Sequence, residues 1–71
     1  MRCRITVRNN IKRFDLIINR DYQEEIINNP EISPQRKLVL QLDKIATEVR
    51  EELERGDIAL ELISVEQVRE D

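Results

Sequence analysis

The sequence predicts one small α+β domain in which an N-terminal β-hairpin packs against one long helix. Two observations carry this prediction. Apolar and polar residues alternate over the first 18 positions, and apolar residues recur at helical spacing between residues 34 and 55. A chain of 71 residues has room for a single domain with a small core, so we treat residues 1–71 as one unit.

The alternation predicts an antiparallel hairpin with strands at about residues 2–8 and 11–18. Asn9 and Asn10 separate the two runs, and asparagine tolerates the left-handed backbone of a tight two-residue turn. That turn places the apolar residues of both strands on one face of the ribbon. The apolar set is Met1, Cys3, Ile5, Val7, Phe14, Leu16 and Ile18.

The opposite face of the predicted hairpin gathers basic side chains, and the same turn sets Arg4 opposite Asp15. Residues 1–20 hold six basic groups and one acid, a net charge near +5, whereas residues 21–71 hold six basic groups and fourteen acids, near −8. This asymmetry indicates either a charged partner or pairing between the two halves of the chain. The candidate partner-binding residues are Arg2, Arg4, Thr6, Arg8 and Arg13.

A short helix is predicted at residues 22–28. Asp21 and Glu24 resemble a capping box at its start, and Pro30 prevents it from continuing. The residues that follow predict a second, longer helix.

This long amphipathic helix spans residues 34–55, with Ser33 as N-cap, Pro34 at the first helical position and Gly56 at the C-terminal cap. Twenty-two residues give a length of about 33 Å. The helix presents one apolar stripe, which we expect to pack on the hairpin and to be most buried near its centre, at Leu42, Ile45 and Val49. The stripe consists of Leu38, Val39, Leu42, Ile45, Ala46, Val49 and Leu53.

The C-terminal segment fits two structures. Alternation favours a third strand at residues 58–63, and Ser64 with Gln67 then resembles a capping box for a short helix at residues 65–70. The same apolar residues also fit one helix over residues 57–70, which stays the alternative.

The composition argues against an enzyme. The chain has no histidine, which is the commonest general base and a frequent metal ligand, and its one glycine cannot build a phosphate-binding loop. Cys3 lies on the apolar face, and Glu48, Glu51 and Glu52 lie beside or away from the helix stripe, where water surrounds them. We predict no catalytic residue, no cofactor and no metal site.

The sequence therefore predicts a small interaction or regulatory module that docks on a protein and forms a homo-oligomer, because its core is thin. The alternative is a nucleic-acid-binding protein that contacts phosphates through the basic face of the hairpin. The single cysteine and the lack of a long apolar run predict a cytoplasmic protein with no membrane partner.

Overall fold

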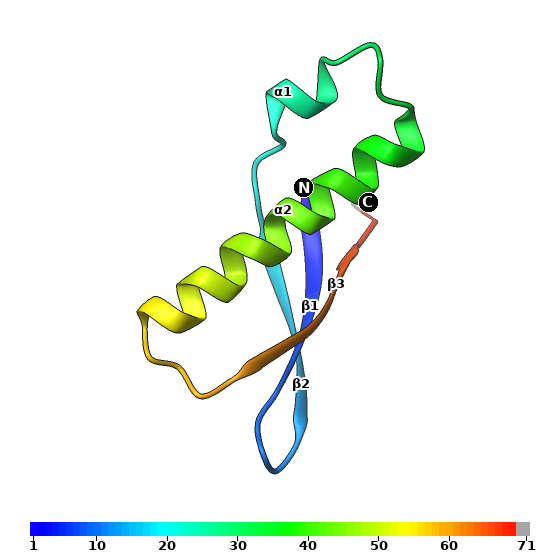
Figure 1. Ribbon diagram of the computed structural model, residues 1–71. Coiled ribbons are helices and arrows are strands. Elements are labelled where there is room, and N and C mark those ends of the chain that lie inside the picture. Colours follow the sequence, from blue (N-terminus) through cyan, green and yellow to red (C-terminus); the bar gives the residue numbers. More distant parts are fainter. Residues whose placement is uncertain (70–71) are drawn as a thin grey trace.

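The computed structural model describes residues 1–69 and confirms the α+β fold (Figure 1). The hairpin, the long helix and a third strand are all present. In chain order the elements are β1 (Arg2–Arg8), β2 (Arg13–Asn19), α1 (Glu24–Ile27), α2 (Pro34–Arg55) and β3 (Glu61–Gln67).

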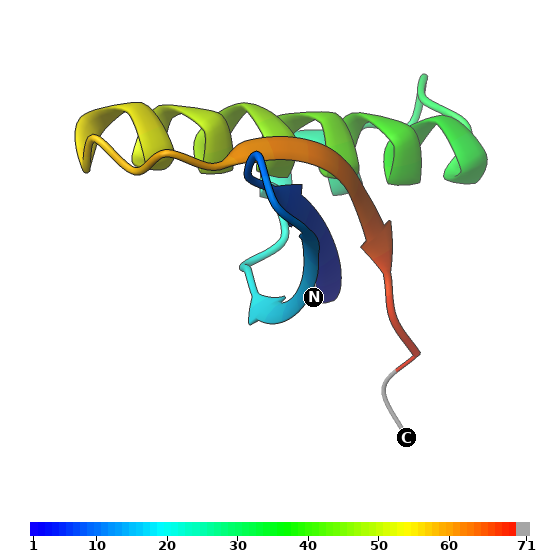
Figure 2. The ribbon, with the colours of Figure 1, turned by 90° about the horizontal axis from the view of Figure 1, so that it is seen from below.

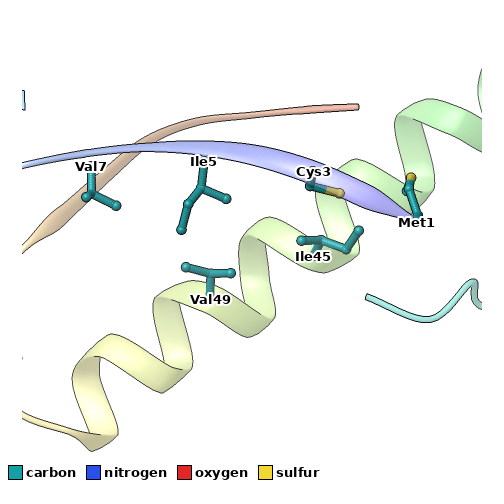
Figure 3. Packing of buried hydrophobic residues seen from close by; sticks show 6 residues of the cluster. All are labelled: Met1, Cys3, Ile5, Val7, Ile45 and Val49. Atoms are coloured by element: carbon teal, nitrogen blue, oxygen red, sulfur yellow. The ribbon is translucent and has the colours of Figure 1, made fainter. Parts of the chain in front are cut away.

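The fold has two layers, with α2 on one face of an antiparallel sheet (Figure 2). Over residues 1–69 the strand order is β2-β1-β3, so β1 is central and pairs with β2 on one side and with β3 on the other. The inner face of β1 meets α2, where apolar side chains from both layers form the core (Figure 3). The buried core residues are Met1, Cys3, Ile5, Val7, Ile45 and Val49.

The hairpin register differs from the two-residue turn that the sequence predicts. Arg8 pairs with Arg13, so the loop has four residues, 9–12. A two-residue turn needs left-handed backbone at both positions, whereas the only non-glycine residue of 1–69 with positive φ is Asp57. The Asn9 carboxamide oxygen instead accepts hydrogen bonds from two loop amides, those of Ile11 at 2.8 Å and of Lys12 at 2.9 Å.

The observed register differs from the predicted one by two residues. Each side chain therefore stays on its predicted face of the sheet, although its partner on the other strand changes. Asp15 lies opposite Thr6, and Arg4 lies opposite Ile17. The inner face of β2 is less well covered than predicted, because Leu16 remains 47% exposed.

The predicted capping box of the short helix is wrong. α1 is a single turn whose N-cap is Gln23, and no side chain caps it. The prediction for α2 is correct at both ends: the Ser33 hydroxyl accepts a hydrogen bond from the Arg36 amide at 3.3 Å, Pro34 is the first helical residue, and Gly56 is the C-cap.

Beyond Gly56 the chain leaves α2 through a Schellman motif. The Ile58 amide donates to the Leu53 carbonyl at 2.9 Å, and the Asp57 amide donates to the Glu54 carbonyl at 3.1 Å. The left-handed residue of this motif is Asp57, with φ of 49°, rather than the neighbouring glycine.

The predicted helix at residues 65–70 is wrong over 65–69, and residue 70 lies outside the described residues. β3 begins at Glu61 and continues through Gln67, and Val65 pairs with Ile5 of β1. A bulge after Thr6 shifts the register, so Leu62 and Val65 pair with inward-facing residues of β1 although they are three apart in the sequence. Apolar residues three positions apart are also typical of a helix, and this spacing led to the wrong prediction.

Candidate functional site: the outer face of the sheet

The five candidate residues all lie on the sheet face that points away from α2, and we call Arg2, Arg4, Thr6, Arg8 and Arg13 the arginine face. The first four alternate along β1 with the buried core residues, and the fifth lies on β2 directly opposite Arg8. All four arginines are exposed, and Thr6 is half-buried. The structure therefore brings the predicted set together on one surface.

Two of these arginines form ion pairs with acids of β3. Arg4 Nη2 lies 3.0 Å from Glu66 Oε2, and Arg8 Nε lies 2.8 Å from Glu61 Oε2. These pairs fix the direction of two guanidinium groups on an otherwise open surface. Each pair is solvent-exposed and contributes only about 0–1 kcal/mol to stability.

A third polar contact joins β1 to β2, where the Thr6 hydroxyl donates a hydrogen bond to Asp15 Oδ1 at 2.8 Å. With Asp15, Glu61 and Glu66, three acids share the outer face with the four arginines. Its charge is therefore nearly balanced, in contrast to the strongly basic surface that the hairpin alone predicts. Within residues 1–69, neither Arg2 nor Arg13 forms an ion pair.

A further ion pair, which the sequence analysis missed, links the residue after β2 to α2. Arg20 Nη1 and Nη2 donate to the two carboxylate oxygens of Glu52 at 2.9 and 2.7 Å. This bidentate hydrogen bonding raises the pKa of Arg20 and lowers the pKa of Glu52. The sequence signal was a basic residue two positions after Ile18, on the same side of the strand as the core.

Gln41 is the second residue that sequence reasoning missed. It is 2% exposed, and its carboxamide makes two hydrogen bonds to the backbone of Gln23: Oε1 accepts from the amide and Nε2 donates to the carbonyl, each at 3.1 Å. Gln41 lies four residues before Ile45 on the buried side of α2, so it was visible as a polar interruption at that spacing. It positions α1 rather than a ligand.

Three further observations concern a thiol, metal ligands and membrane spans, and they cover residues 1–69. Cys3 is fully buried in the core. Across residues 1–69 no three potential metal-ligating side chains lie together. In the same residues, no helix combines the length and the hydropathy that a membrane span requires.

Comparison of the chain with protein-family models, with curated proteins and with solved structures finds no match.

Proposed function

We propose that this protein is a non-enzymatic interaction module that docks on a protein partner through the arginine face and assembles with its own copies. The observation that carries the proposal is the near balance of charge on that face: two of its four arginines are paired with acids of β3. Arginine is enriched at protein interfaces, and a guanidinium already held by a carboxylate is oriented for a partner.

The same balance disfavours the alternative of nucleic-acid binding. A phosphate backbone attracts cations that are free to replace its counterions, and each paired arginine must first give up its carboxylate. The three acids on the outer face also repel phosphates. Phe14, the aromatic residue of the hairpin, lies on the inner side and packs against the core, so it offers no stacking platform on this face.

The experiment measures binding of the purified protein to a nonspecific DNA duplex and to RNA at physiological salt. We expect no micromolar binding by the wild-type protein. The double variant Glu61→Gln/Glu66→Gln releases both paired arginines, and we expect it to bind the duplex with a clear salt dependence. Binding by the wild-type protein that the triple variant Arg2→Ala/Arg4→Ala/Arg8→Ala abolishes would refute the proposal.

Single alanine variants of the same three arginines test the protein partner. Each variant is used to capture proteins from a native extract, and the captured species are quantified. For a protein interface, one or two of the arginines should dominate retention and the others should have little effect. Equal, additive losses at all three positions would indicate generic charge attraction and would contradict a defined interface.

A further inference from the structure

The outer edge of β2 is open, because the strand order places β1 on its other side only. The Arg20 amide donates to the Met1 carbonyl at 2.9 Å, and the Met1 amino group donates back to the Arg20 carbonyl. Since these bonds alternate along an antiparallel pair, the even-numbered residues of β2 face β1 with their backbone groups. The odd-numbered residues direct theirs to the open edge, and these are Arg13, Asp15, Ile17 and Asn19.

This edge carries two charged residues, Arg13 and Asp15, but it lacks two other features that usually prevent edge-to-edge association, proline and a bulge. Residues 13–19 contain no proline, and the register with β1 runs without a bulge, whereas the other edge strand, β3, carries one. Leu16 and Ile17 are 47% and 49% exposed, on opposite faces of the strand. A regular strand with an unpaired backbone and exposed apolar side chains on both faces fits addition of another strand.

We propose that β2 pairs with β2 of a second copy of this chain, antiparallel and centred on Ile17. This inference rests on the self-association part of the proposed function. In this register Ile17 faces its own equivalent, Leu16 faces Ile18, and Arg13 comes opposite Asp21, which lies two residues beyond the end of β2. Both exposed apolar residues gain an apolar partner, and a basic residue meets an acid at each end of the ladder.

The neighbouring registers are less favourable. A pairing centred on Asp15 sets two carboxylates directly opposite each other. A pairing centred on Leu16 sets Ile17 against Asp15. It also brings Lys12 against Arg20, a like-charge contact. The opposed charges and apolar residues therefore favour a second copy of the chain, paired in the register centred on Ile17.

Directly opposed residues lie on the same face of a sheet, so the two copies form one continuous sheet with both α2 helices on the same side. The inner faces of the two β2 strands then meet between the helices. Leu16, which α2 leaves half-exposed, lies at this junction. The arginine faces of the two copies lie together on the other side and remain open to a partner.

Sedimentation equilibrium of the purified full chain tests the pairing, with Ile17→Lys as the disrupting variant. Ile17 is 49% exposed, so the monomer tolerates lysine, but two lysines face each other in the dimer. The matched control is Ile11→Lys, the same change at a loop position that is 89% exposed. We expect a wild-type dimer, an unchanged control, and a dimer dissociation constant raised at least about tenfold by Ile17→Lys.

Cross-linking of single-cysteine substitutions tests the register of the pairing. Ile17→Cys places two thiols on residues whose Cα atoms are about 5.5 Å apart, within disulfide range. Leu16→Cys places its Cα atoms about 8 Å apart, beyond that range. We expect oxidation to cross-link Ile17→Cys only, and the wild-type chain, with buried Cys3, to stay uncross-linked.

The proposal is overturned by a monomeric wild-type protein at about 100 μM, a concentration at which even weak specific dimers are populated. It is also overturned by equal dissociation constants for Ile17→Lys and Ile11→Lys, or by cross-linking of Leu16→Cys instead of Ile17→Cys. These measurements use purified protein alone. A monomeric wild-type protein also removes the self-association part of the proposed function, whereas the two variant outcomes remove the β2 pairing alone. None of them decides whether the arginine face binds a partner.

Discussion

Replacing Ile45 with alanine should destabilise the protein by about 2–5 kcal/mol, the range for removing a large aliphatic side chain from a core. Ile45 is 1% exposed and lies below Cys3 of the central strand, with Met1 beside it (Figure 3). With 71 residues, the free energy of unfolding is expected to be only about 4–11 kcal/mol. A single truncation at this position therefore removes a large share of the total stability.

Urea unfolding followed by circular dichroism at equal protein concentration measures the effect, because self-association makes the midpoint concentration-dependent. The matched control on the same helix is Val39→Ala. Val39 is 58% exposed, so its truncation should change stability by less than about 0.5 kcal/mol. A loss below about 1 kcal/mol for Ile45→Ala, or equal losses for the two variants, would show that α2 does not pack on the sheet through this residue.

Three further predictions concern single contacts. Asp57→Gly should raise the free energy of unfolding by about 0.5–1 kcal/mol, because glycine adopts the left-handed backbone at φ of 49° without strain; an unchanged melting temperature would contradict this. Gln41→Ala should cost about 1–3 kcal/mol, because it leaves the partly buried amide of Gln23 without its acceptor, and hydrogen exchange should show faster exchange of that amide. Glu52→Gln removes a carboxylate whose pKa is lowered by Arg20. The wild-type protein should therefore have a higher free energy of unfolding than the variant at neutral pH, and this difference should vanish as the pH falls through the lowered pKa. A difference that stays constant during acid unfolding would refute the prediction.

The elements that the sequence predicts correctly are those defined by local patterns. Ser33, Pro34 and Gly56 delimit α2 through hydrogen bonds within a few residues of each other, and those bonds form whatever the rest of the chain does. The hairpin faces are equally local. A register error of two residues leaves every side chain on its predicted face, so the apolar set survives the mistaken turn.

The errors come from contacts between distant segments. Gln41 is buried because the chain before α1 folds back over the helix, and its amide partner, Gln23, is 18 positions away in the sequence. Leu16 is exposed because a single helix is too narrow to cover the inner faces of all three strands. Neither outcome follows from periodicity, which identifies the apolar side of an element but not how far its partner extends.

The bulge between β1 and β3 explains both the misassigned C-terminal helix and the balanced charge of the arginine face. Glu61 and Glu66 are five positions apart, an odd separation that puts two residues of a regular strand on opposite faces. The extra residue of the bulge restores the phase, so Glu61 pairs with Arg8 and Glu66 with Arg4 on the same outer face. A strand predicted from alternation alone leaves one of these arginines without its acid. The bulge therefore brings the second of the two β3 acids onto the outer face, which already carries Asp15 of the hairpin, and the proposed protein interface rests on the resulting near balance of charge.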